Sequence, residues 1–169
     1  MKYKALLLTL ISLSFLGCKS ETNSDKYSQT PSYLDSSKNP DQFLGGIKMV
    51  PIQTPKGEFK VWTKRVGNNP SMKVLLLHGG PGMTHEIYES FDGYFPNAEI
   101  EYYYYDQLGS YYSDQPEDLS LWQLDRFVEE VEQVRLALGL DASNFYLYGQ
   151  SWGGILGMQY ALKYQEHLK

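Results

Sequence analysis

The chain has 169 residues, of which 42% are hydrophobic and 15% aromatic, so it can form one modest globular domain with a buried core. Acidic residues outnumber lysine and arginine by 20 to 15, which gives a formal net charge of −5, and no block of basic residues occurs. A protein that grips the phosphates of nucleic acid needs such a block, so the composition excludes nucleic acid as a partner.

The N-terminus predicts an exported protein. Lys2 and Lys4 precede a thirteen-residue apolar run at residues 5–17, and the single cysteine, Cys18, follows at once. This run is too short to cross a bilayer, which takes about 20 residues, and its basic start and small last residue are typical of a secretory signal. The stretch SFLGC resembles the lipobox of bacterial lipoproteins, with Phe15 where leucine is usual. That resemblance implies lipidation of Cys18; the alternative is a signal peptide with an accidental cysteine.

Residues 18–41 predict a flexible tether. They are rich in Ser, Asn, Asp, Lys and Pro and have almost no apolar side chain to bury; a plain disordered N-terminus would look the same. The expected organisation is a lipoprotein signal peptide (1–17), a tether (18–41) and one domain (42–169). Such a protein would be held to a bacterial membrane by its N-terminal lipid, on the periplasmic or cell-surface side.

Strand-like runs open the domain. Residues 45–54 and 57–66 are two such runs joined by the turn sequence Pro-Lys-Gly, and they predict an antiparallel hairpin. Three short apolar runs bounded by Gly and Asp follow, with helical segments between them, and predict a parallel sheet that is buried on both faces. These runs are Lys73–Gly80, Glu99–Asp106 and Asn144–Gly149.

Two helices are predicted beside this sheet. The first spans Leu121–Leu138, with Ser120 and Gln123 as a capping box and Gly139 as its end. Its apolar face consists of Leu124, Phe127, Val128, Val131, Val134 and Leu138. The second helix spans residues 151–164, and its apolar side chains predict packing against the sheet. These side chains are Ile155, Leu156, Tyr160 and Leu162. The order of elements indicates an α/β layer fold.

A candidate nucleophile lies between the last strand and the last helix. Ser151 stands in the pattern Gly149-x-Ser151-x-Gly153, and glycines at these two positions relieve crowding around a serine on a sharp strand-to-helix turn. The pentapeptide alone recurs by chance, but here the strand and the helix are both present. The amide of Trp152, at the start of the helix, could face the negative charge that develops on a carbonyl oxygen.

A glycine-rich loop follows the third strand and could supply a second amide. It reads His78-Gly79-Gly80-Pro81-Gly82, and its missing side chains would let the backbone approach a substrate. The alternative is an ordinary tight turn, which this concentration of glycine directly after a buried strand disfavours.

Three motifs together resemble the proline iminopeptidases, serine aminopeptidases of the α/β-hydrolase superfamily. They are HGGPG (78–82), DQLGS (106–110) and GQSWGG (149–154), and the resemblance extends over residues 45–169. Where that family commonly has DQRGSGRS, this chain has Leu108 and the pair Tyr111 and Tyr112. It is therefore more similar to the leucine-bearing branch that includes the tricorn-associated aminopeptidases. Members of that branch accept small or apolar N-terminal residues besides proline.

The resemblance implies a role for each matching residue. Ser151 would be the nucleophile, and the amides of Gly80 and Trp152 would stabilise the oxyanion, with Trp152 also forming an apolar wall beside the first side chain of the substrate. The implied substrates are short peptides with a free N-terminus, and neither a cofactor nor a metal is implied. A serine at this position argues against the related epoxide hydrolases and dehalogenases, which carry aspartate.

The base that should activate Ser151 is missing from the expected places. His167 would lie roughly 24 Å away along the same helix, His78 belongs to the glycine-rich loop, and His85 carries no motif. In the superfamily the aspartate and histidine of the triad follow the serine at a distance, whereas here eighteen residues follow it. The triad partners and the cap domain are therefore expected to lie outside this chain.

The sequence thus predicts the N-terminal portion of an α/β-hydrolase fold that lacks the cap domain and the C-terminal strands. The favoured hypothesis is a fragment of a lipid-anchored aminopeptidase. The alternatives are an esterase or lactonase of the same fold, and an inactive truncated lipoprotein or binding module. The last alternative is disfavoured because a chain that ended here would expose the edge of the last strand and apolar helix faces.

Overall fold

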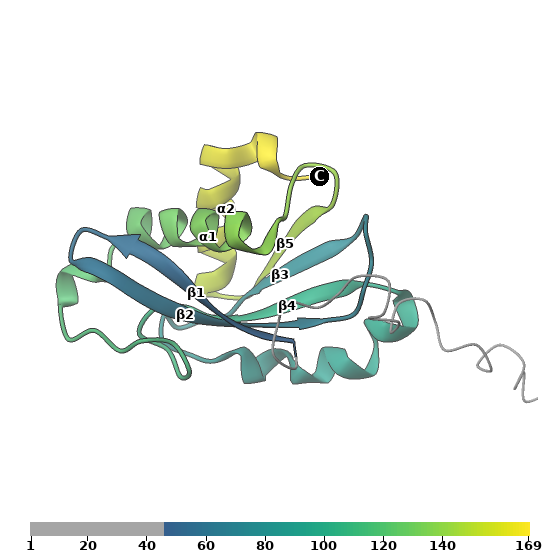
Figure 1. The fold of residues 1–169 in the computed structure, drawn as a ribbon, viewed down its shortest axis with the longest axis horizontal. Helices are drawn as coiled ribbons and strands as arrows, with labels where there is room; N and C mark the ends of the chain where they lie inside the picture. Colours follow the sequence, from purple (N-terminus) through teal and green to yellow (C-terminus); the bar gives the residue numbers. More distant parts are fainter. Residues whose placement is uncertain (1–45) are drawn as a thin grey trace, which may run out of the picture.

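The computed structural model describes residues 46–169, which form a five-stranded sheet with helices on both faces (Figure 1). The order across the sheet is β1-β2-β4-β3-β5. The strands are β1 (Ile47–Thr54), β2 (Gly57–Val66), β3 (Lys73–Leu77), β4 (Glu101–Asp106) and β5 (Phe145–Gly149). The predicted signal peptide, Cys18 and the tether lie outside the described residues.

All five predicted strands are confirmed, and their pairing is mixed. β1 and β2 form the antiparallel hairpin, and β2 also pairs antiparallel with β4, whereas β3 pairs parallel with both β4 and β5. This arrangement puts β5, the strand that leads to Ser151, at one edge of the sheet. The neighbour of β5 is β3, so the glycine-rich loop after β3 and the serine after β5 leave the same end of adjacent strands.

The central strand β4 does not alternate between buried and exposed residues. All six of its residues are buried, because both faces of the sheet are covered here. Tyr103 and Tyr105 belong to the core beneath α1 (Leu124–Leu138) and α2 (Trp152–Tyr164). Tyr102 and Tyr104 belong to the core on the other face, and both donate a hydrogen bond to Asp92.

The 3₁₀ segment η3 (His85–Gly93), with the short η4 (Pro96–Ala98), covers that second face. Tyr88 of η3 is buried against Leu76 of β3 and the tyrosines of β4. Its hydroxyl donates to the carbonyl of Leu77 at 2.7 Å. The helical segment expected between the third and fourth strands is therefore present in 3₁₀ form.

Helix α1 begins later than the sequence predicted. Its apolar face is buried as expected, except that Leu124 is only partly buried, and Gly139 ends the helix with a left-handed φ of 65°. The prediction that Ser120 and Gln123 form a capping box is wrong, because the side chain of Gln123 makes no capping hydrogen bond. Asp118 instead accepts a hydrogen bond from the Ser120 amide at 2.9 Å and starts a separate 3₁₀ turn, η5 (Leu119–Leu121). An aspartate two residues before a free amide forms such a local bond readily, which competes with helix extension.

Helix α2 buries only part of its apolar surface. Leu156 and Tyr160 are fully buried, as predicted, but the prediction for the other two residues is wrong: Ile155 is 46% and Leu162 80% exposed. They are seven residues apart and therefore share one face of α2, which no other part of residues 46–169 covers. Within the same residues, β5 has no further strand on its outer side. An apolar groove of about 390 Å³ runs there between β5 and α2, as far as Met158 and Leu168.

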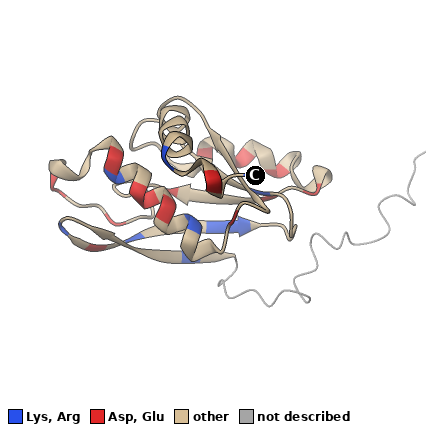
Figure 2. Ribbon diagram, turned by 90° about the horizontal axis from the view of Figure 1, so that it is seen from above, with Lys and Arg blue, Asp and Glu red and all other residues tan. Residues whose placement is uncertain are grey.

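Charged side chains are distributed unevenly over the fold. Figure 2 shows acidic residues along the helices, and α1 carries acidic residues together with arginines that pair with them. Arg126 pairs with Glu130, and Arg135 pairs with Glu132, within that helix. No helix in residues 46–169 is long and apolar enough to cross a membrane.

Candidate active site

Ser151 has a strained backbone. It is exposed, directly follows β5 and precedes α2, and its φ of 56° and ψ of −121° place it in a region that residues with a side chain rarely adopt. Such a conformation costs on the order of 1–3 kcal/mol and persists only where the surroundings enforce it. The sharp turn that the sequence pattern predicted is present.

The two flanking glycines are required by the packing of this turn. A Cβ atom on Gly149 would lie 2.2 Å from the carbonyl oxygen of Gly153, and one on Gly153 would lie 1.8 Å from the carbonyl oxygen of Leu77. Both contacts are with backbone, which cannot move aside. At Gly154, one residue later, an added Cβ atom would lie 3.5 Å from the nearest atom, the carbonyl oxygen of Gly149, so a methyl group would fit there.

We expect Gly153→Ala to lower the free energy of unfolding by at least about 2 kcal/mol, because the added methyl group overpacks against the β3 backbone. Gly154→Ala is the matched control and should be neutral or stabilising, since alanine favours a helix over glycine by about 1 kcal/mol. Urea unfolding followed by circular dichroism measures both. Equal stability of the two variants would contradict this packing.

The glycine-rich loop packs against the serine. Gly80 has a φ of 114°, and a Cβ there would lie 2.7 Å from the amides of Gly82 and Met83. A Cβ on Gly79 would lie 3.3 Å from both the carbonyl oxygen of Gln150 and the Cβ of Ser151. A cavity of about 330 Å³ opens at this junction, lined by Gly79, Met83, Ile87, Gln150 and Ser151.

Trp152 is the first residue of α2. The first amides of a helix have no partner within the helix and lie at its positive end, so they can interact with an anion. Trp152 is half-buried, and its indole ring packs edge-on against Phe127 at 5.5 Å between centroids. The structure therefore brings Ser151, the amide after it and the glycine-rich loop to one end of the sheet.

His78 is a buried structural residue. Its Nδ1 lies 2.9 Å from the carbonyl oxygen of Gly79, and its Nε2 accepts a hydrogen bond from the Gln107 amide at 3.0 Å. Because a carbonyl can only accept, Nδ1 carries the proton and the ring is neutral. Burial is the main cause of its lowered pKa. Both ring nitrogens are engaged, so neither can take a proton from Ser151.

The lowered pKa of His78 predicts a pH dependence of stability. The unfolded chain binds a proton at the ordinary pKa of about 6.5 and the folded chain only at a lower pH, so the contribution is full above pH 6.5 and is lost as the pH falls towards the lowered pKa. For one proton, the loss is at most about 1.4 kcal/mol per pH unit. Urea unfolding between pH 8 and 5 should show a steeper decline for the wild type than for His78→Gln. In an NMR titration, a His78 ring that titrates near 6.5 in the folded protein would contradict this.

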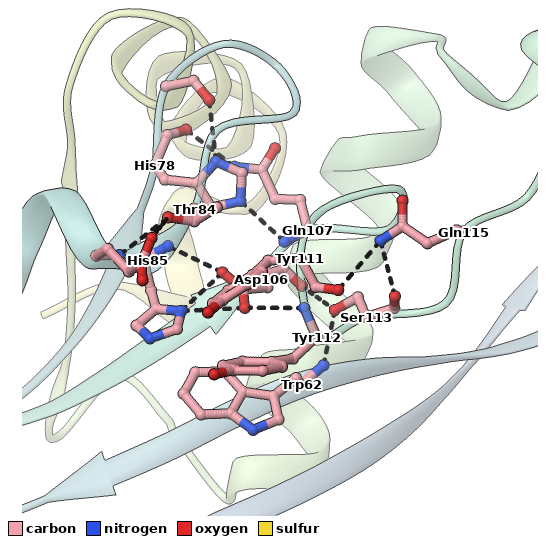
Figure 3. A network of polar contacts seen from close by, with 12 residues as sticks. Trp62, His78, Thr84, His85, Asp106, Gln107, Tyr111, Tyr112, Ser113 and Gln115 are labelled. Atoms are coloured by element: carbon pink, nitrogen blue, oxygen red, sulfur yellow. Dashed lines mark hydrogen bonds and ion pairs between the residues drawn. The ribbon is translucent and has the colours of Figure 1, made fainter.

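The other two histidines bind other groups, and neither lines the cavity at Ser151. His85 is buried, and its ring Nδ1 and its backbone amide both lie 2.9 Å from Oδ1 of Asp106, while Trp62 stacks on the ring (Figure 3). His167 lies in η6 (Gln165–His167), beyond the end of α2, where its Nδ1 is 3.3 Å from Glu132. These three are all the histidines of the sequence.

The end of β4 and the loop after it contain buried polar residues to which sequence reasoning gave no role. Asp106 and Gln107 are both fully buried; the DQLGS motif was their only signal in the sequence. Tyr111 has a φ of 36°, which favours glycine, at the position where the proline iminopeptidase motif has one. Residues 46–169 contain no group of three or more His, Cys, Asp or Glu side chains that could hold a metal ion.

Comparison with known proteins agrees with this geometry. Residues 73–169 match the family model of the alpha/beta hydrolase fold. Proline iminopeptidases from Flavobacterium johnsoniae and Elizabethkingia meningoseptica are each 66% identical over 121 residues, which is 72% of this chain and 41% of each relative. The crystal structure of proline iminopeptidase from Mycobacterium smegmatis superposes with a TM-score of 0.63 at 28% identity, over 72% of this chain and 41% of that one.

The chain thus spans about two fifths of the length of the curated relatives it matches. Its expected resemblance to the proline iminopeptidases is confirmed. The family match includes β3, β4, β5 and both long helices, and so contains the glycine-rich loop as well as the candidate nucleophile. On this match the chain belongs to the α/β-hydrolase fold family.

Proposed function

We propose that this chain carries the nucleophile of a serine aminopeptidase that releases N-terminal proline, or another small apolar residue, from short peptides. The observation that carries the proposal is the strained, exposed Ser151, packed against a glycine-rich loop at the end of the neighbouring strand. The 66% identity to proteins named proline iminopeptidase supports the choice of substrate.

In the proposed reaction, Ser151 attacks the carbonyl carbon of the first residue. A base takes the Oγ proton, and the amides of Gly80 and Trp152 stabilise the oxyanion of the tetrahedral intermediate. The peptide amine leaves with that proton, and water then hydrolyses the acyl-enzyme. We assign the base to a histidine outside these 169 residues, because the three histidines of the chain bind other groups and none of them lines the cavity at Ser151.

A pair of substrates tests the proposed specificity. The protein that the gene encodes should hydrolyse prolyl p-nitroanilide and should lose that activity when the substrate amine is acetylated, because an aminopeptidase recognises the free amine. Equal rates on both compounds, or turnover of p-nitrophenyl acetate alone, would instead indicate an esterase or lactonase of the same fold.

We further propose that Cys18 is lipidated and that residues 18–41 tether the domain to a membrane. The support is the basic start, the short apolar run and the SFLGC sequence. In bacterial cells, the wild type should incorporate labelled palmitate and partition into detergent, and Cys18→Ser should do neither. Label that remains in Cys18→Ser would overturn this proposal.

A further inference from the structure

We propose that Gln107 is a positioning residue that fixes the two oxyanion donors, Gly80 and Trp152, relative to each other. This inference rests on the proposed acyl-transfer chemistry but not on the identity of the substrate. Gln107 directly follows β4 and is fully buried, and it lies beside the end of β3, the strand that leads into the glycine-rich loop.

The side-chain amide of Gln107 connects two elements. Its Nε2 donates to the carbonyl oxygen of His78 at 2.9 Å, in the glycine-rich loop. Its Oε1 accepts from the indole Nε1 of Trp152 at 3.0 Å, at the start of α2. Figure 3 shows Gln107 beside His78, where the Gln107 backbone amide also donates to Nε2 of the His78 ring.

The orientation of this amide is determined by its partners. The carbonyl of His78 can only accept and the indole N–H of Trp152 can only donate, so the amide satisfies both in one orientation. Each buried group would cost about 1–3 kcal/mol if it were left without its bond. The distance between the loop and the helix is therefore held to the span of one glutamine amide.

Each end of this connection leads directly to an oxyanion donor. On one side, His78 precedes Gly80 by two residues, and the loop between them packs closely on the nucleophile turn, because even a Cβ atom on Gly79 would lie 3.3 Å from Gln150 and Ser151. On the other side, the indole ring and the donor amide belong to the same residue, Trp152. A change in the length or polarity of the Gln107 side chain should thus move one donor relative to the other.

The test compares two substitutions with one control. Gln107→Met keeps the length of the side chain and removes both hydrogen bonds. Gln107→Glu keeps the acceptor but has a donor only when its carboxyl group is protonated. Ser113→Ala is the control, because Ser113 lies in the same loop, is buried, and makes two hydrogen bonds, with Trp62 and Asp106, that reach neither donor.

Rates are measured on the protein that the gene encodes, with prolyl p-nitroanilide and with p-nitrophenyl acetate. We expect Gln107→Met to lower kcat by about 10- to 100-fold on both, somewhat less than the complete loss of one donor, with KM changed less than about threefold. Ser113→Ala should keep kcat within about threefold of the wild type. If Gln107→Met, at equal folded concentration, retains the wild-type kcat, or if Ser113→Ala loses as much, the proposal is wrong.

A pH profile distinguishes positioning from general stabilisation. The ratio of kcat for Gln107→Glu to that of the wild type should rise as the pH falls, because a protonated carboxyl group has one donor and one acceptor, like the amide. The ratio for Gln107→Met should stay constant, since His78 and Asp106 are common to all three proteins. A constant ratio for Gln107→Glu would overturn the inference.

One measurement separates this inference from the proposed function. If the wild type hydrolyses only the ester, the aminopeptidase proposal fails while the Gln107 comparison continues on the ester. If it hydrolyses neither, the amide NMR signals of Gly80 and Trp152 decide. Both should shift in Gln107→Met and neither in Ser113→Ala; a shift of only one, or of neither, would refute the coupling.

Discussion

In the protein that the gene encodes, Ser151→Ala is expected to lower kcat on prolyl p-nitroanilide by about four orders of magnitude or more, with little change in KM. The reason is that no acyl-enzyme can form without the Oγ atom, so that only binding and the oxyanion donors remain. Ser143→Ala is a suitable control, because Ser143 is an exposed serine in the turn before β5. Retention of more than about 1% of the wild-type rate by Ser151→Ala would exclude this serine as the nucleophile.

The same position also predicts a gain in stability. Ser151→Gly removes the nucleophile and relieves the positive φ, so its free energy of unfolding should exceed that of the wild type by about 1 kcal/mol. An inactive variant that is more stable than the wild type would indicate strain retained at a functional residue. A destabilised Ser151→Gly would show that the side chain, and not the turn, holds this conformation.

The second large effect concerns the 169-residue chain by itself. Purified residues 18–169 are expected to hydrolyse prolyl p-nitroanilide at least about 10⁴-fold more slowly than a full-length proline iminopeptidase. No histidine lines the cavity at Ser151, and His78, His85 and His167 are bound to other groups. The remaining rate would come from the oxyanion donors and from binding.

The contrary outcome would also be informative. Turnover by residues 18–169 at the rate of the full-length relative would require a base within the chain, and His78 would be the first candidate because it adjoins the loop at Ser151. His78→Gln would then have to abolish the activity. If His78→Gln kept it, His85→Gln would be examined next, followed by His167→Gln.

The sequence by itself predicted the elements and the nucleophile turn, because both are recorded in local patterns. Strands buried on two faces leave continuous apolar runs, as in β3 and β4, and a helix that covers a sheet leaves a 3.6-residue period, as in α1. The glycines around Ser151 are equally local, since Gly149 would collide with the turn that follows it. The helix start was wrong for a local reason too, because two capping signals, Asp118 and Ser120, compete within three residues.

Only the tertiary structure decided which distant residues meet. Ile155 and Leu162 are apolar but exposed, because no other element within residues 46–169 packs on their face of α2, and an apolar residue in the sequence does not say whether a neighbour covers it. Gln107 and Trp152 are 45 residues apart in the sequence, much farther than two residues that meet within one helix or turn, yet a hydrogen bond joins their side chains. The pairing of His85 with Asp106 likewise requires β4 to lie beside β3. Such contacts are set by the packing of strands onto one another, and a hydrogen bond between distant side chains leaves no periodic signal in the sequence.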